Sequence, residues 1–303
     1  MDSTNYLAEI FLKKKLIKYE NIKNILLKKY FLYKNKYINL KQLRGGNNNI
    51  KILSYNVSWE SMIGHRDDCG DCKKNIIKVF NDNICDFFLI QEASNFDDVE
   101  FKDMTKLYHK SGPEDSIIYY NNSYKLISHI NGEFEVGRPY IIASFEKDGN
   151  NIIIINVHLP NDSPKYFKII TQSMIDEFKS IIQPPYPTDD IIKNFLVKIK
   201  QIKMIEKDLQ HIDRSTKIII GGDFNFDFIP NYPIQISDIN FTKEKESLNT
   251  CCDFFVEGDI SMIINKLDHF LITDNLQFLD FNYATTIKPK HSDHLPIVAT
   301  IKL

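Results

Sequence analysis

The stretch "IIIGGDFNFD", residues 218–227, sets the fold prediction for this chain. Three consecutive isoleucines favour a buried strand. Two glycines end the apolar run, and Asp223 and Asn225 follow with one residue between them. Glycine lets the backbone and a substrate approach each other closely. The stretch therefore predicts a rigid, buried strand that holds a carboxylate and an amide at its end.

Seven other short apolar runs, rich in β-forming residues, predict further strands. They span residues 50–57, 86–92, 116–122, 140–147, 151–159, 266–273 and 295–303. Helical patterns occupy residues 73–83 and 188–212. Strands outnumber helices and several follow one another directly. We therefore expect an α/β (α+β) layered domain in which stacked sheets are flanked by helices.

The first 46 residues differ from the rest of the chain in charge. They hold 11 Lys or Arg against 3 Asp or Glu, a net +8, whereas residues 47–303 hold 27 against 37, a net −10. The segment reads as helical and ends in a Gly/Asn stretch typical of a flexible linker. We expect a basic, removable N-terminal arm, residues 1–46, and a globular domain, residues 47–303. A solvated helix or a disordered tail is the alternative for the arm.

The composition excludes several classes of protein. Apolar residues make up 43% and charged residues 26%, as in ordinary soluble globular proteins. No apolar stretch approaches the roughly 20 residues that span a bilayer, so we expect no membrane span. The stretch "FLKKKLIKYE", residues 11–20, is not typical of a secretory signal, because lysines interrupt it. Five cysteines do not make a disulfide scaffold, so we expect an intracellular protein.

Polar side chains stand at or near the ends of these predicted strands. In open sheets the binding crevice lies beyond the strand ends, so such residues can meet there. A single one is commonly a turn residue, but turns do not explain the joint pattern. The residues are Asn56, Glu92, His158, Asp223, Asn225, Asp268, Asp293 and His294.

In this order, Asn56, Glu92 and the motifs "NVHLP", "GDFN", "LDHF" and "SDHLP" resemble those of the endonuclease/exonuclease/phosphatase superfamily, typified by pancreatic deoxyribonuclease. Each motif alone is weak, whereas the ordered set over residues 50–303 is specific. The resemblance implies a four-layered α/β sandwich with two packed mixed sheets flanked by helices. It also implies that residues 47–303 are a catalytic domain for Mg²⁺-dependent hydrolysis of phosphate esters, with Mn²⁺ able to substitute.

The resemblance implies a role for each residue of the set, and the chemistry of the side chains agrees. Glu92, Asn56 and Asp293 are the expected metal ligands, since Mg²⁺ prefers carboxylate and amide oxygens. His294 is the expected general base, oriented by Asp268. The other catalytic candidates are Asp223 for the water or the metal, Asn225 for the phosphate and His158 for a non-bridging or leaving oxygen.

Three further residues have open interpretations. Arg138 opens the strand before His158 and either pairs with a phosphate or forms a surface salt bridge. Trp59 follows the first predicted strand and is expected to form a stacking wall for the substrate. His269 points away from Asp268, because alternate strand residues face opposite sides, and is interpreted as packing or surface.

The substrate class is narrowed by comparison with branches of the superfamily. "KLDHF" lacks the Trp-x-Asp-Arg pattern of inositol-polyphosphate phosphatases, and abasic-site endonucleases carry tyrosine where His158 stands. With His158 at this position, the chain resembles the deoxyribonuclease, tyrosyl-DNA phosphodiesterase and sphingomyelinase branches, which all have histidine there. We expect a monomeric DNA nuclease or DNA-end-processing phosphodiesterase. A hydrolase of a lipid or other small phosphoester, and a non-catalytic binding module on the same fold, are the alternatives.

The arm carries a resemblance of its own. "KKYFLYKNKYINLKQLRGG", residues 28–46, is similar to Lys/Tyr-rich leaders ending in Gly-Gly on proteins of large DNA viruses. The Asn/Ile/Lys bias of the chain fits an AT-rich viral genome. The resemblance implies a location in the host cytoplasm or nucleus, or in the virion.

Deleting residues 1–46 should leave the melting temperature of the remaining chain within a few degrees, because the arm lies outside the strand-rich domain. The net +8 of the arm should also give the full chain tighter and more salt-dependent DNA binding than the shortened one. Thermal unfolding and binding at several salt concentrations test both. A large loss of melting temperature would place the domain boundary elsewhere, and equal salt slopes would contradict an electrostatic role.

Overall fold

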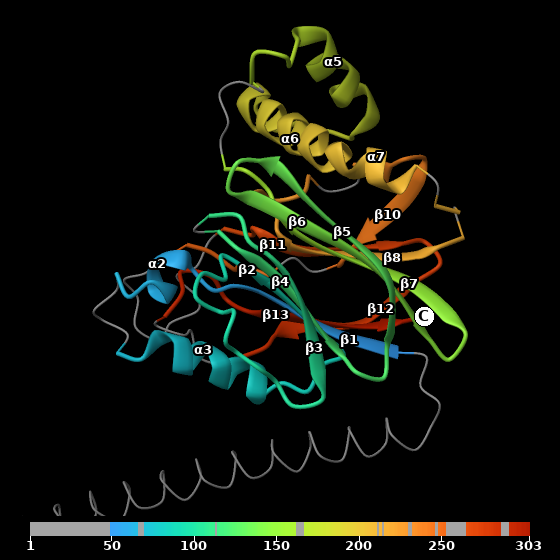
Figure 1. Ribbon diagram of the computed structural model, residues 1–303. Coiled ribbons are helices and arrows are strands. Elements are labelled where there is room, and N and C mark those ends of the chain that lie inside the picture. The colour runs from blue at the N-terminus through green and yellow to red at the C-terminus, as the bar shows by residue number, and fades with distance from the viewer. Residues whose placement is uncertain are drawn as a thin grey trace, which may run out of the picture. The chain divides into compact units, whose positions relative to one another are not determined.

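The computed structural model describes residues 49–65, 70–112, 114–161, 167–210, 212–213, 215–229, 232–245, 248–252, 265–285 and 291–303 (Figure 1). The basic arm, residues 1–46, lies outside these ranges, so its helical character and the domain boundary stay predictions. Within the described ranges, no helix is long and apolar enough to cross a membrane.

Two mixed sheets form the centre of the fold, with strand orders β12-β13-β1-β2-β4-β3 and β5-β6-β7-β8-β11-β10-β9. The strands of the first sheet are β1 Asn49–Asn56, β2 Phe87–Gln91, β3 Met104–His109, β4 Ser116–Asn121, β12 Gln277–Tyr283 and β13 Ile297–Lys302. Those of the second are β5 Lys125–Glu135, β6 Arg138–Lys147, β7 Asn150–His158, β8 Lys217–Asp223, β9 Ile234–Ile236, β10 Ile239–Lys243 and β11 Asp268–Thr273. Each sheet contains one parallel pair, β1 with β2 and β7 with β8.

Helices cover the outer face of each sheet, which gives four layers: helix, sheet, sheet, helix (Figure 1). The first sheet carries α2 Trp59–Met62 and α3 Cys72–Asn81. The second carries α5 Gln172–Ile181, α6 Asp189–Ile202, the 3-10 helix η2 Lys203–Ile205 and α7 Glu206–Leu209. The predicted four-layered sandwich is therefore confirmed.

The isoleucine run of β8 is buried because this strand packs on both of its faces. Ile219 belongs to the apolar core between the two sheets, with Leu89 and Phe270. Ile218 and Ile220 belong to the core between the second sheet and its helices. Because side chains alternate along a strand, an uninterrupted apolar run is what a strand covered on both faces requires.

The two glycines after this run make room for neighbouring parts of the fold. A Cβ at Gly221 would overlap the side chains of Phe270 on β11 and of Leu89 in the facing sheet. Gly222 has a φ of +148°, and a Cβ there would overlap the main-chain carbonyl of Val157 on β7. The expected close approach of backbone is confirmed. The expected approach of a substrate stays a prediction.

Strand pairing brings the predicted strand-end residues together. β8 lies between β7 and β11, and Asp223 pairs with His158 on one side and with Asp268 on the other. In the other sheet, β1 and β2 run parallel, so that Asn56 lies opposite the residue before Glu92. The register of both sheets therefore directs these residues to one region.

The strands and helices predicted within the described part of the chain are all present, and seven further elements there were not predicted. Four of those, β3, β5, β9 and β12, are the edge strands of the two sheets. The others are β10, α5 and the short helix α2. The predicted helix at residues 188–212 is divided into α6, η2 and α7 and ends at Leu209.

Replacing Gly222 by alanine should destabilise the protein more than replacing Gly149, which has a φ of +76° and nothing within 4 Å of an added Cβ. Gly149→Ala should cost about 1–2 kcal/mol, the cost of a left-handed conformation. Gly222→Ala adds a clash with the main chain of β7 and should cost about 1–3 kcal/mol more. Urea unfolding followed by circular dichroism measures both, and equal losses would contradict the packing role of Gly222.

Candidate active site

The candidate active site lies where the ends of β7, β8 and β11 face the ends of β1 and β2 of the other sheet. Beneath it, a buried hydrogen bond of 2.6 Å from Gln91 Nε2 to Asn156 Oδ1 joins the two sheets. Asn156 Nδ2 also donates to the carbonyls of Ile90 and Ile117. Buried amides whose hydrogen bonds are satisfied in this way make the packing of the two sheets rigid and unique. They therefore set the spacing between the site residues of one sheet and those of the other.

His294 and Asp268 form the central pair of the site. His294 Nδ1 lies 2.8 Å from Asp268 Oδ2, and both side chains are buried. The Asp268 main-chain N–H donates to Thr250 Oγ1, and the His294 N–H donates to Ser292 Oγ. Burial alone would lower the pKa of His294, but the carboxylates of Asp268, Asp223 and Asp293 outweigh it and raise that pKa well above its usual value.

Asp223 lies between the two histidines of the site. Its Oδ2 is 3.6 Å from His294 Nε2 and 3.5 Å from His158 Nε2, and it accepts a 3.0 Å hydrogen bond from Asn56 Nδ2. Its Oδ1 accepts from the Asn225 main-chain N–H. Burial raises the pKa of Asp223 to about 6, with Asp268 adding to the shift and the nearby His294 opposing it. The Asp223 carboxylate therefore lies close to both histidines and accepts a hydrogen bond from Asn56.

Asn56 joins the carboxylates of the two sheets. Its Nδ2 donates to Glu92 Oε1 and to Asp223 Oδ2, each at 3.0 Å, and its Oδ1 accepts from the Ser58 N–H. Glu92 Oε2 accepts from the Trp59 main-chain N–H at 2.9 Å. Glu92 has a φ of +55°, a conformation that costs a non-glycine residue free energy and is characteristic of functional sites. Burial raises the pKa of Glu92.

His158 is held by Arg138 and by a residue that the sequence analysis missed, Glu114. Arg138 Nη1 lies 2.7 Å from His158 Nε2 and forms an ion pair with Glu114 Oε2, which lies 3.4 Å from His158 Nδ1. Burial, together with the charge of Arg138, lowers the pKa of His158 well below its usual value. Burial raises the pKa of Glu114 to about 7. Arg138 therefore lies at the site, and its ion pair is not a surface salt bridge.

The remaining predicted residues occupy the edges of the site. Asn225 is half-buried, has a φ of +55° and donates from Nδ2 to the Leu159 carbonyl at 2.8 Å. Asp293 is half-buried beside His294. Trp59 is also half-buried, and its ring contacts His65 edge-on at 6.2 Å between centroids. Trp59 reaches the site through its main chain, so a stacking role for its ring stays a prediction.

The site holds more negative than positive charge. Its carboxylates are Glu92, Glu114, Asp223, Asp268 and Asp293, and its cationic groups are Arg138 and a protonated His294. Asp268 Oδ1 is buried and has no hydrogen-bond partner within the described part of the chain. Buried carboxylates in excess are unfavourable unless a cation offsets them. The donor set of carboxylates and an amide fits a hard divalent cation such as Mg²⁺.

His269 is a structural residue of the interior. It is fully buried, with Nδ1 2.7 Å from Glu244 Oε1 and Nε2 2.8 Å from the Lys266 carbonyl. Both ring nitrogens face acceptors, which favours the imidazolium. Burial lowers the pKa of His269, but the charge of Glu244 and its hydrogen bond outweigh that effect and raise it. The interpretation as packing is confirmed, and the surface alternative is wrong.

Comparison with known proteins supports the fold. No protein-family model and no curated protein matches this sequence. Solved structures match it. An endonuclease/exonuclease/phosphatase family protein from Bacteroides thetaiotaomicron gives a TM-score of 0.59 at 14% identity, over 84% of this chain and 97% of that chain.

Two further matching structures were determined with a bound ligand. The human Nocturnin catalytic domain with bound sulfate gives a TM-score of 0.55 at 14% identity, over 84% of this chain and 94% of that chain. D. rerio TDP2 in complex with a single-strand DNA product gives 0.54 at 12% identity, over 84% and 99%. At such identities the similarity establishes the fold. The chain has the α+β fold of the endonuclease/exonuclease/phosphatase proteins, as the sequence analysis predicts.

The His269–Glu244 pair should make stability depend on pH. Because the folded-state pKa of His269 is raised, its contribution is fully present below the unfolded value of about 6.5 and is lost as pH rises through the folded pKa. Urea unfolding of the wild type from pH 6 upward should show this loss, and His269→Gln should show a smaller one, to which the raised pKa of His294 still contributes. His129→Gln, on the exposed face of β5, should keep the wild-type dependence. An unchanged profile in His269→Gln would contradict the ion pair.

Proposed function

We propose that the protein is a divalent-metal-dependent phosphodiesterase that hydrolyses phosphodiester bonds in DNA, as a nuclease or DNA-end-processing enzyme. The observation that carries the proposal is the buried His294–Asp268 pair, whose second imidazole nitrogen faces Asp223 across 3.6 Å. A histidine held in this tautomer by a carboxylate is the arrangement of a general base. The surrounding excess of carboxylates supports metal-dependent rather than metal-free hydrolysis.

His294 would take the proton of the attacking water. With Nδ1–H donating to Asp268, the lone pair of Nε2 is directed toward the space beside Asp223, and Asp268 stabilises the imidazolium that forms. Asp223 Oδ2 would accept a hydrogen bond from the same water and orient it. Both residues are fixed by main-chain and side-chain hydrogen bonds, so little reorganisation is needed when the proton moves.

Glu92 and Asp293 would hold the metal ion, and Asn56 would hold Glu92 in place. Bound Mg²⁺, or Mn²⁺ in its place, would polarise a phosphoryl oxygen and offset the carboxylate charge that raises the pKa of His294. Asn56 Oδ1 already accepts the Ser58 N–H. We therefore assign Asn56 to orienting the Glu92 carboxylate through Nδ2 rather than to binding the metal directly.

Arg138 and His158 would bind the phosphate. The guanidinium carries several donors, and its contacts with Glu114 and His158 use only Nη1. The second amide hydrogen of Asn225 would add a neutral donor. Developing negative charge on the non-bridging oxygens would then meet preorganised donors rather than water.

DNA is the proposed substrate because a neighbour in fold was determined with a single-strand DNA product. The net charge of −10 outside the arm gives little general attraction for a polyanion. The metal, Arg138 and the basic arm would therefore have to supply it. A monomeric state, an intracellular or virion location and a viral origin stay predictions.

Three substitutions should reduce activity in different ways. His294→Ala removes the proton acceptor and should lower turnover about 10²- to 10⁴-fold at every Mg²⁺ concentration. Asp268→Asn keeps the imidazole without its orienting carboxylate and should be intermediate. Glu92→Gln weakens the metal site, so its activity should recover in part as Mg²⁺ is raised. Steady-state hydrolysis of a DNA substrate, titrated with Mg²⁺, measures all three.

His129→Ala, on the exposed face of β5, is the matched control and should keep wild-type activity. If His294→Ala retains more than about a tenth of wild-type turnover, it is not the general base. The substrate panel should include single- and double-stranded DNA, RNA, tyrosyl-linked DNA and sphingomyelin. Cleavage of sphingomyelin alone would replace DNA with a lipid substrate, and no cleavage under any divalent metal would favour a binding module.

A further inference from the structure

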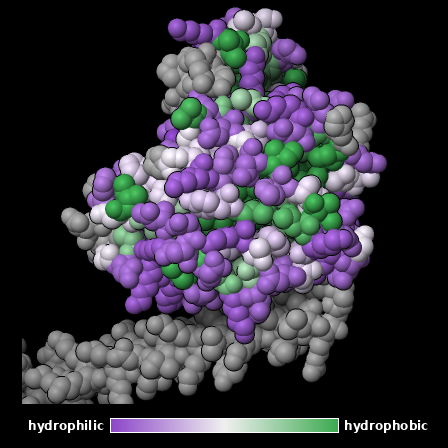
Figure 2. Space-filling view, viewed as in Figure 1, coloured by the Kyte–Doolittle hydropathy of each residue, from purple (hydrophilic) through white to green (hydrophobic). Residues whose placement is uncertain are grey.

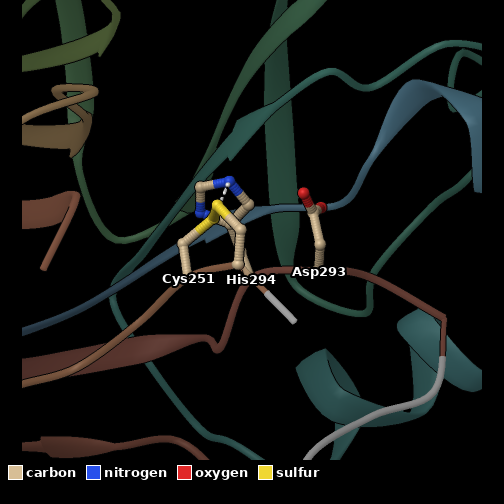
Figure 3. Close-up of side chains that lie close together, drawn as sticks. Cys251, Asp293 and His294 are labelled. Carbon is tan, nitrogen blue, oxygen red and sulfur yellow. Dashed lines mark hydrogen bonds between the residues drawn. A yellow bond between two sulfur atoms is a disulfide. The ribbon is translucent and has the colours of Figure 1, made fainter. Parts of the chain in front are cut away.

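A cysteine lies against the general base, on the side away from Asp268. Cys251 Sγ is 3.3 Å from His294 Nε2, and both residues are buried (Figure 3). The position of Cys251 is set by the main chain, because its N–H donates to the Asn265 carbonyl and the Leu295 N–H donates to the Thr250 carbonyl. The position of the Cys251 sulfur is therefore a fixed feature of the site.

Four potential metal ligands meet at this point. Ligand atoms of Cys251, Cys252, Asp293 and His294 lie within 4.8 Å of one another. Sulfur and nitrogen ligands of one tetrahedral zinc ion are about 3.5 Å apart, from bond lengths of about 2.3 and 2.0 Å. The observed 3.3 Å between Cys251 Sγ and His294 Nε2 is close to that separation.

The second nitrogen of His294 fits the same interpretation. Metal-binding histidines commonly donate their other N–H to a carboxylate, which fixes the tautomer and strengthens the ligand. Asp268 does this for His294 at 2.8 Å. The tautomer that makes His294 a base toward water therefore also makes it a ligand for a metal ion.

The two sides of the site differ in the metal that they select. Glu92 and Asn56 offer oxygen, which suits Mg²⁺, whereas Cys251 and His294 offer sulfur and nitrogen, which suit Zn²⁺. Asp293 stands with the second group and is also an expected ligand of the first. A thiophilic ion on Cys251 would occupy the lone pair that His294 needs for catalysis.

In the structure Cys251 and Cys252 form a disulfide, so neither sulfur is a thiolate. We propose that reduction of this disulfide opens a Zn²⁺ site formed by Cys251, His294 and Asp293, with Cys252 at its rim, and that Zn²⁺ bound there inhibits the enzyme. The inhibition rests on the proposed phosphodiesterase function; the metal site does not. A dithiol supplies the two electrons: the S–S bond breaks, two S–H bonds form, and the dithiol becomes a disulfide. Each thiol that then binds zinc releases its proton to solvent.

The test of the site uses Co²⁺, which gives a thiolate-to-metal charge-transfer absorption when bound to sulfur, on the full chain. Cys72 is also disulfide-bonded, so a reductant can expose thiols elsewhere. Cys252→Ser avoids this difficulty, because it leaves Cys251 as a thiol without any reductant. We expect the cobalt band in unreduced Cys252→Ser and its removal by added Zn²⁺. Unreduced wild type and Cys251→Ser should lack it.

Cys85→Ser is the matched control, because Cys85 is a buried free cysteine outside the site. After reduction it should show the same cobalt band as reduced wild type. Absence of the band in both Cys252→Ser and reduced wild type would overturn the metal site. A band of full size in Cys251→Ser, with or without reduction, would place the metal elsewhere and overturn it too.

The inhibition is tested by hydrolysis of the best DNA substrate with Mg²⁺ in excess. Zn²⁺ at the concentration that saturates the cobalt site should lower turnover of Cys252→Ser by about 10²-fold, as expected when a general base is blocked. Unreduced wild type and Cys251→Ser should be affected little. A cobalt band without inhibition would overturn the inhibitory role. A band in a protein that cleaves no substrate under any metal would support the metal site and overturn the phosphodiesterase.

Discussion

The register of β8 with its two neighbours is the constraint on which the rest of the site depends. Asp223 is paired with His158 on β7 and with Asp268 on β11, so residues remote in sequence become adjacent through main-chain hydrogen bonds. A slip of one residue would turn the side chains of β8 to the opposite face. Gly222 allows this register, because any side chain there would meet the main chain of β7. Fold and chemistry are therefore specified by the same short stretch of sequence.

This arrangement is electrostatically unfavourable without a further cation. Asp223 and Asp268 are almost completely buried, and an uncompensated buried ion costs several kcal/mol. Asn56 offsets part of that cost with hydrogen bonds to two carboxylates, and His294 offsets more when it is protonated. A protonated His294 cannot accept a proton from water. Under the proposed function, the carboxylates that orient His294 would therefore require a bound cation, because only a neutral His294 can act as the base.

The buried strands were predictable from the sequence and the edge strands were not, for one physical reason. Central strands such as β7 and β8 are covered on both faces, so their sequences are continuous apolar runs. The edge strand β5 is mostly exposed, with polar residues and a glycine along Lys125–Glu135, and its sequence resembles a loop. Its pairing with β6 comes from the hairpin connection and the main chain. Main-chain contacts of this kind do not require apolar side chains, so the sequence of β5 carries no apolar pattern that predicts a strand.

The same distinction separates the site residues that were predicted from those that were missed. Asp223 and His158 end buried strands, Asp268 begins one, and all three were identified by their place at or near strand ends. Glu114 lies in the loop between the edge strand β3 and β4, where "GPEDS" is typical of a turn, and its contact with His158 joins parts of two different sheets. Cys251 likewise reaches His294 through a loop held by main-chain hydrogen bonds. Strand ends thus supply His158, Asp223 and Asp268, whereas loops supply His294, Glu114 and Cys251, whose positions depend on contacts made elsewhere in the fold.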